Sequence, residues 1–555
     1  MQGHIPLRHE TESLWRVTAL VSLFLATSQF RGATESSKMT VAPEWAVFER
    51  TFKSSVEYSN ALQDATLQVL FTSPQGQTNL VYAFWDGGRT WRVRFAPDKL
   101  GRWTYRTVCS DSSNEGLQHQ TGEFLCTAPV GESNLSKNGP VRIAHDGRHL
   151  EYADGKPFFW MGDAAWDAAR ESEWLDWEIY TVARQYQSFT AIEWTVAPGP
   201  DEKGESALTG FNDHIGINPA FFQRLDSKVQ FMSQVGLVSA IVPFWEAQFD
   251  QTAGLALPDD QIALFLRYVA ARFGAEPVVW VLPFDAASPE KQAQRWKKIG
   301  SAVFGADRRA PVMIYAGTNA AVVQTLGDQP WVSIIGYRGE PFPASGPQET
   351  NAADAPLLNQ LTNAPGHPLI PFVFSESETS GRVIQGLTAG EVRHNAYWNL
   401  LSKLPVGLSY EARDIARWNM ATEPENPDVP LWRWSLFTSA SRQMSFLSQL
   451  MQTVDFWRLV PTPQILATQT GTGAKHTQDL ALSTMNKDLV VIYLAESRML
   501  ELSLLDVPRS FRAVWFNPRT GETTKAGAAR SAKTCRFSPP EAGDWVLVLK
   551  GAPQE

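Results

Sequence analysis

Cysteine is scarce in this sequence, and long basic runs are absent. Three cysteines, Cys109, Cys126 and Cys535, occur among 555 residues. They are too few for a disulfide-stabilised scaffold, and their spacing matches no zinc motif. Cys109 and Cys126 could pair across a predicted hairpin or stay as buried thiols, and the sequence leaves both open. The net charge is −9 and no run of five Lys or Arg residues occurs, so no nucleic-acid partner is expected.

Long apolar stretches are also absent, apart from one short segment near the N-terminus. Residues 17–26 (VTALVSLFLA) follow Arg8 and Arg16 and precede small residues, as in a signal peptide. The segment is shorter than the ~20 apolar residues of a membrane-spanning helix. We therefore interpret residues 1–38 as a signal peptide or leader. We expect an exported protein (periplasmic, cell-surface or secreted) without a membrane span after signal removal.

Aromatic side chains are abundant, with 21 Trp, 30 Phe and 12 Tyr. Most of these rings are expected to pack in hydrophobic cores, and the remainder suit the apolar faces of sugar rings. A chain of this length predicts roughly two to four domains. Its charged content of 19% is typical of folded domains rather than disordered segments.

The two ends of the chain outside the leader have the pattern of β-structure. In residues 39–130, polar and apolar residues alternate at 67–71 and 91–95, with turn residues between the runs. This pattern predicts an N-terminal β-sandwich. In residues 467–555, apolar runs are separated by the strong turn signal of Asn517–Gly521, which predicts a second, C-terminal β-sandwich.

The central segment, residues 131–466, alternates short apolar runs with amphipathic helical stretches. Eight such runs predict a (β/α)8 TIM barrel, flanked by the two sandwiches. A doubly wound open sheet is the alternative. It needs a Gly-rich phosphate loop after its first strand, and Met161–Trp166 (MGDAAW) is not one. The predicted barrel strands are 158–161, 191–194, 238–242, 278–282, 311–315, 332–335, 372–374 and 406–410.

Carboxylates and aromatic residues follow the predicted strands, where the catalytic groups of TIM barrels lie. Asp285 ends a long uncharged run, and Ser288–Glu290 is a better start for the next helix, so we interpret Asp285 as catalytic. Glu376, after the seventh strand, is the second catalytic candidate. Glycoside hydrolysis needs such a carboxyl pair, with aromatic rings that stack on sugars. The predicted substrate-binding residues are Asp163, Trp166, Trp245, Glu246, Tyr337, Arg338, Tyr410 and Trp418.

Other kinds of chemistry find no support in the sequence. Histidines and cysteines do not cluster with acids at metal-ligand spacing, so neither a metal nor another cofactor is implied. No Gly-x-Ser-x-Gly motif lies along the barrel strands, which argues against an esterase or another barrel enzyme of that kind. The expected partner is a carbohydrate substrate.

The three predicted domains together resemble a known arrangement. The segments Phe159–Trp166, Val278–Asp285 and Arg393–Trp398 resemble those of the apiosidase-like family of (β/α)8 glycoside hydrolases. Phe84–Gly88 is similar to part of the domain that precedes that barrel, and Val514–Glu522 is similar to part of a collagen-binding-type module that follows it. The resemblance covers nearly the whole chain after the leader.

The resemblance implies a glycoside hydrolase that cleaves a plant- or algal-type polysaccharide or oligosaccharide by a retaining mechanism. It implies that Asp285, after the fourth strand, is the acid/base and that Glu376, after the seventh, is the nucleophile. Two segments depart from the family's pattern. Pro283-Phe284 stands where a Gly-Gly pair is usual, and Tyr410-Glu411 stands where a Tyr-Gly pair is usual. Bulkier residues reshape the subsite beside the leaving group, so the resemblance implies the reaction class rather than apiose as the sugar.

Three expectations follow for the site. The two carboxyls should face each other across the barrel mouth, about 5–5.5 Å apart for retention or about 6.5–9.5 Å apart for inversion. Apolar neighbours should raise the pKa of Asp285, whereas flanking serines leave Glu376 ionised. The sandwiches should supply packing but no catalytic residue. The alternative is a non-catalytic carbohydrate-binding or adhesion protein, which the Pro283-Phe284 pair favours and the presence of both acids opposes.

Overall fold

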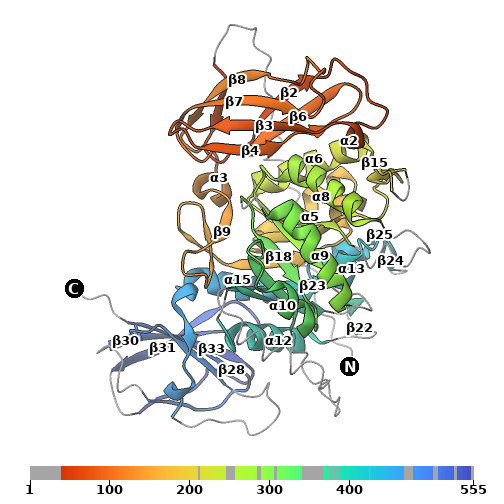
Figure 1. Cartoon of the computed structure of the whole chain (residues 1–555). Coiled ribbons are helices and arrows are strands. Elements are labelled where there is room, and N and C mark those ends of the chain that lie inside the picture. Colours follow the sequence, from red (N-terminus) through yellow and green to blue (C-terminus); the bar gives the residue numbers. More distant parts are fainter. Residues whose placement is uncertain are drawn as a thin grey trace.

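A closed barrel of eight parallel strands forms the middle of the molecule (Figure 1). β23 pairs with β12 through Trp160 and Gly407 and so closes the barrel. The predicted TIM barrel is confirmed. In order, its strands are β12 (Trp160–Ala164), β13 (Ala191–Ala197), β16 (Val238–Phe244), β17 (Val278–Pro283), β18 (Val312–Tyr315), β19 (Ile334–Arg338), β20 (Leu369–Ser375) and β23 (Gly407–Ala412).

The computed structural model describes most of the chain after the predicted leader, and residues 1–38 lie outside it. The described residues are 39–210, 213–245, 257–283, 289–305, 309–339, 367–375, 378–379, 382–383, 387–404, 406–423, 426–467, 479–503, 510–530 and 534–551.

Helices surround the barrel and bury the outer face of its strands. β13 and β16 are buried along their whole length, because helices cover one side of each strand and the barrel interior covers the other. Such strands are mostly apolar on both faces, which explains why they were evident in the sequence. The main helices are α5 (Trp174–Tyr186), α6 (Pro219–Val235), α8 (Asp259–Phe273), α9 (Pro289–Phe304), α10 (Ala320–Leu326), α12 (Ala389–Leu401) and α15 (Ser439–Thr453).

The N-terminal domain contains two antiparallel-rich sheets, shown in red and orange in Figure 1. Aromatic rings fill the space between them: Phe71 stacks on Phe95, and Phe48 stacks on Phe124. One sheet has the order β1-β8-β7-β3-β4 and the other β2-β6-β5. Their strands are β1 (Val41–Pro43), β2 (Phe48–Lys53), β3 (Leu67–Thr72), β4 (Thr78–Tyr82), β5 (Phe84–Trp85), β6 (Thr90–Phe95), β7 (Gly101–Cys109) and β8 (Thr121–Thr127).

Two of the three cysteines lie in this domain, at opposite ends of neighbouring strands. Cys126 of β8 pairs with Gly101, the first residue of β7, whereas Cys109 is the last residue of β7 and pairs with Leu67. The length of β7 separates the two residues by about 26 Å at the usual rise of a strand. They are buried free thiols, so the disulfide that the sequence left open does not form between them.

The C-terminal domain is also built of strands and lies on a different side of the barrel from the N-terminal domain (blue in Figure 1). Its larger sheet has the order β26-β27-β28-β33-β30-β31, and β29 pairs with β32. The strands are β26 (Val460–Pro461), β27 (Leu480–Ser483), β28 (Leu489–Leu494), β29 (Leu500–Leu502), β30 (Ser510–Phe516), β31 (Thr523–Arg530), β32 (Cys535–Phe537) and β33 (Trp545–Gly551).

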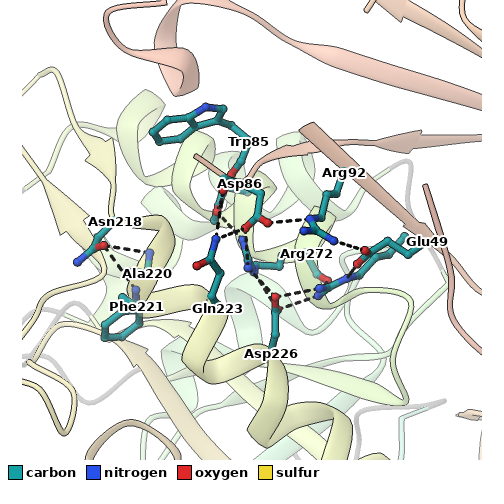
Figure 2. Close-up of polar contacts among 12 residues, drawn as sticks. Glu49, Trp85, Asp86, Arg92, Asn218, Ala220, Phe221, Gln223, Asp226 and Arg272 are labelled. Carbon is teal, nitrogen blue, oxygen red and sulfur yellow. Dashed lines mark hydrogen bonds and ion pairs between the residues drawn. The ribbon is translucent and has the colours of Figure 1, made fainter. Parts of the chain in front are cut away.

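Buried charges join the N-terminal domain to the barrel helices (Figure 2). Arg94 of β6 donates hydrogen bonds of 2.8 and 2.9 Å to the two carboxylate oxygens of Asp226 in α6. Arg272 of α8 lies between two acids, with its Nη2 atom 2.5 Å from Asp226 and 2.9 Å from Asp86. Burial alone would raise the pKa of Asp226, but the two guanidinium groups hold it below its usual value. We call Arg94, Asp226, Arg272 and Asp86 the charge ladder. Each charged side chain in it has a partner of opposite sign.

A second charged contact attaches the C-terminal sheet to α12. Arg393 donates hydrogen bonds of 2.6 and 2.8 Å to Asp544, which directly precedes β33. Tyr493 of β28 donates a further hydrogen bond of 3.1 Å to this carboxylate. The ring of Tyr493 stacks on Tyr397 of α12, with 4.6 Å between the ring centroids. The two flanking domains thus pack on different helices of the same barrel.

Candidate active site

Alternation along each barrel strand decides which side chains face the interior. In β12 and the residues after it, Trp160, Ala164 and Trp166 belong to one hydrophobic cluster, which draws residues from all around the barrel. Met161 and Ala165 belong to the other cluster, which includes the residues of the surrounding helices. The first cluster is the barrel interior and the second is the layer between strands and helices.

Asp163 points outward into the helix layer. Its carboxylate accepts hydrogen bonds of 2.7 and 3.0 Å from Arg184 of α5 and one of 2.5 Å from the hydroxyl of Tyr180. The side chains of Asp163 and Arg184 are fully buried. Asp163 therefore anchors α5 to the first strand, and a bound sugar cannot contact it. This position corrects the prediction that Asp163 binds substrate.

Three predicted aromatic contacts also lie outside the barrel interior. Tyr337 and Tyr410 are buried in the helix layer. The Lys403 ammonium lies 4.5 Å from the ring centroid of Tyr337. Trp418 stacks on Trp432, with 4.2 Å between the ring centroids, and is 2% exposed. These residues pack the helices against the barrel, so their predicted role in substrate binding is corrected as well.

Two predicted tryptophans do meet inside the barrel. Trp166 and Trp245 contact each other edge to face, with ring centroids 5.0 Å apart, and each is 8% exposed. Trp166 also lies parallel to Phe372 of β20. Arg338 is exposed at the end of β19, the strand next to β20. We call Trp166, Trp245 and Phe372 the aromatic wall. Aromatic rings with a guanidinium nearby suit a carbohydrate, whose rings have apolar faces and polar edges.

Glu411 is a carboxyl group that the sequence analysis noted only as a departure from the family pattern. It lies on β23 and accepts a hydrogen bond of 3.0 Å from the indole nitrogen of Trp166. Burial raises the pKa of Glu411 to about 7, and the Trp166 hydrogen bond and the charges of Arg338 and Arg417 oppose this rise. The interior therefore contains an acid that titrates near neutral pH.

Glu193 is a second interior acid, which the sequence analysis missed. It is fully buried on β13, and the Ser409 hydroxyl donates a hydrogen bond to its Oε1 atom. Trp160 in turn donates a hydrogen bond of 3.0 Å to the Ser409 oxygen. The Oε2 atom of Glu193 has no hydrogen-bond partner among the described residues. Burial raises the pKa of Glu193 to about 8, so this group is protonated at neutral pH.

A glycine makes room for this buried acid. A Cβ atom on Gly162 would lie 2.5 Å from the Glu193 carboxylate and 2.7 Å from the Ser409 hydroxyl. Both distances are shorter than van der Waals contact, so no larger residue fits without displacing Glu193. The signal for Glu193 in the sequence is a lone charged residue inside an otherwise apolar strand, Ala191–Ala197.

The two catalytic candidates, Asp285 and Glu376, lie outside the described residues, as does Glu246. In the sequence, Asp285 comes two residues after the end of β17, the fourth barrel strand. Glu376 directly follows β20, the seventh barrel strand. Their roles and their separation remain predictions.

Neither a metal site nor a membrane-spanning helix occurs in the described part of the chain. Among those residues, no group of three or more His, Cys, Asp or Glu side chains is arranged to hold a metal ion. No helix within the same ranges has both the length and the apolar character to cross a bilayer.

Comparison with known families decides the classification. Residues 144–458 match the family described as "Apiosidase-like, catalytic domain". The chain belongs to the apiosidase-like family. It is accordingly a glycoside hydrolase, and its substrate is a carbohydrate. Within this apiosidase-like chain, residues 41–110 match a domain of unknown function (DUF5060), and residues 460–550 match a domain described as "Putative collagen-binding domain of a collagenase".

Solved structures with the same fold include three glycoside hydrolases. A glycoside hydrolase of family 5 from Bacteroides vulgatus is 19% identical with a TM-score of 0.65, over 77% of this chain and 96% of its own. A "putative glycoside hydrolase" from the same organism is 16% identical with a TM-score of 0.69, over 93% of this chain and all of its own. A third, described as "Glycoside hydrolase", is 19% identical with a TM-score of 0.64. It covers 77% of this chain and all of its own. No curated protein matches the chain.

Proposed function

We propose that this apiosidase-like protein cleaves O-glycosidic bonds in a plant- or algal-type polysaccharide or oligosaccharide by a retaining mechanism. Asp285 acts as the acid/base and Glu376 as the nucleophile. The observation that carries the proposal is the alternation of inward positions in the fourth and seventh strands. Val281 of β17 and Phe372 of β20 both belong to the interior cluster. Asp285 and Glu376 follow the ends of these two strands, at the same odd or even spacing in the sequence as the inward residues. This spacing supports the proposal that their side chains also face the interior.

In the proposed reaction, Glu376 attacks the anomeric carbon and the bond to the leaving oxygen breaks. Asp285 gives its proton to that oxygen, so the first sugar leaves as an alcohol and the second stays bound as a glycosyl ester of Glu376. Asp285, now ionised, takes a proton from water, which attacks the same carbon and releases Glu376. In this proposal the bound sugar stacks against the rings of Trp166 and Trp245, which contact each other inside the barrel.

The test compares Glu376→Gln and Asp285→Asn on natural oligosaccharides and on activated aryl glycosides. Glu376→Gln should abolish turnover on every substrate, because no covalent intermediate can form. Asp285→Asn should lose about 10²–10⁴-fold on natural substrates but much less on aryl glycosides, whose leaving groups need no proton. NMR of the first product should show that the anomeric configuration is retained.

Glu378→Gln removes a carboxylate two residues further along the sequence and is the matched control, with turnover expected to stay close to that of the original chain. Equal losses on both substrate classes for Asp285→Asn would remove that residue from the acid/base role. Binding of oligosaccharides without cleavage of any of them would instead favour the carbohydrate-binding or adhesion protein.

A further inference from the structure

Glu411 occupies the last inward position of the eighth barrel strand. In the strand ladders, Tyr410 pairs with Asp163 of β12, and Glu411 pairs with Phe374 of β20. Glu411 thus lies between the first and seventh strands, where the barrel closes. Ser409, one inward position earlier, is fully buried and bonded to Glu193. Glu411 is the polar group nearer the carboxyl ends of the strands, and it is only partly buried.

One oxygen of Glu411 fixes the orientation of the aromatic wall. Its Oε2 atom accepts the hydrogen bond from the indole nitrogen of Trp166, and that indole also packs against Phe372 and Trp245. The Oε1 atom makes no hydrogen bond to another described residue. A partly exposed carboxylate oxygen beside an aromatic ring is a suitable acceptor for a hydroxyl of a sugar that stacks on the ring.

We propose that Glu411 determines which sugar this enzyme accepts. Its Oε2 atom holds Trp166 in place, and its Oε1 atom accepts a hydrogen bond from a hydroxyl of a neutral sugar that lies against Trp166. An ionised Glu411 also repels the carboxylate of a uronic acid at this position. The inference rests on the proposed glycosidase function and adds the class of sugar to it.

The experiment uses the full chain and 4-nitrophenyl glycosides of neutral hexoses and pentoses and of glucuronic and galacturonic acid. On the neutral glycoside that is cleaved best, Glu411→Gly should raise KM about tenfold or more with a smaller change in kcat, since the site loses a ground-state contact. The preference for neutral glycosides over uronides should fall by about tenfold. Glu411→Gln still accepts the Trp166 hydrogen bond through its amide oxygen. Its NH2 group then takes the place of Oε1 and donates to the sugar hydroxyl instead of accepting from it, so Glu411→Gln should keep the neutral KM within about threefold and gain activity on uronides.

Two further measurements separate specificity from folding and from turnover. Glu132→Gln removes an exposed carboxylate outside the barrel and should leave KM and the neutral-to-uronide ratio unchanged. Calorimetric binding of the same glycosides to Glu376→Gln, with and without Glu411→Gly, reports the contact without cleavage. A KM, a sugar preference and a binding constant of Glu411→Gly all within about twofold of the parent would overturn the inference, while cleavage by the parent would keep the proposed function. If the parent cleaves no glycoside but Glu411→Gly still weakens binding, the function fails and the inference survives.

Discussion

Replacing Glu193 with glutamine should make the stability of the barrel less dependent on pH. Glu193 is fully buried, and only one of its two carboxylate oxygens has a hydrogen-bond partner among the described residues. Burial raises its pKa to about 8, and the charges of Asp163 and Glu411 add to the rise, while the hydrogen bond from Ser409 opposes it. Glutamine has nearly the same shape and keeps an acceptor for Ser409, but it has no proton to lose.

The sign of the effect follows from proton binding. The ordinary pKa of a glutamate is 4.5, and the folded value of Glu193 is about 8. Between these values the folded protein holds one proton that the unfolded chain has lost, so the free energy of unfolding falls as the pH rises. One proton corresponds to about 1.4 kcal/mol per pH unit, which amounts to roughly 3 to 4 kcal/mol between pH 5 and pH 8. Above the folded pKa the contribution stays constant.

The measurement is scanning calorimetry of the parent and of Glu193→Gln at pH 5, 6, 7 and 8. All other groups titrate in both proteins, so the difference between their unfolding free energies isolates Glu193. That difference should shift in favour of Glu193→Gln as the pH rises. Glu132→Gln, on an exposed side chain, controls for the loss of one carboxylate. A difference that changes by less than about 0.5 kcal/mol across the range would refute the buried, protonated state of Glu193.

Two further predictions concern packing around the barrel. Arg272→Ala should lower the free energy of unfolding by about 1–3 kcal/mol, because Asp86 and the partly buried Asp226 lose this cation and keep only Arg92 and Arg94 as partners. Calorimetry checks this, and a loss below about 1 kcal/mol would show that the ladder does not stabilise the interface. Gly162→Ala should destabilise the barrel by about 1–3 kcal/mol, because its methyl group overlaps the Glu193 and Ser409 side chains. Glu193→Ala in the same chain should recover part of that loss, and its failure to do so would contradict the assigned overlap.

The sequence was a good guide to the barrel strands and a poor guide to the direction of their side chains. Strands such as β13 and β16 are buried on both faces, so they appear as mostly apolar runs. Such runs are easily found but do not indicate which residues face inward. Asp163 follows the expected rule for catalytic residues at strand ends, yet its side chain points to Arg184 on α5. That partner is 21 residues away on a helix, and no strand pattern reveals it.

The two interior acids, Glu193 and Glu411, were not predicted as site residues for a different reason. Glu193 lies within a strand rather than beyond its end, so a search of strand ends passes over it. Its neighbour Ser409 comes from the last strand, and the two meet because the barrel closes. Glu411 was visible as a departure from the family pattern, but its contact with Trp166 spans 245 residues. Such contacts depend on closure of the barrel, which a local pattern does not encode.

The two interior acids lie at different depths in the barrel, and we infer different roles for them from this difference. Glu411 is closer to the charges of Arg338 and Arg417, and its pKa is raised to about 7, whereas that of the deeper Glu193 is raised to about 8. An ionised Glu411 carries its negative charge beside Trp166. That charge then opposes ionisation of Glu193, because like charges in a region of low dielectric raise each other's pKa. A neutral Glu193 joins β13 to β23 through its hydrogen bond with Ser409. Glu411 is therefore the interior acid whose charge would interact with a sugar at the barrel mouth.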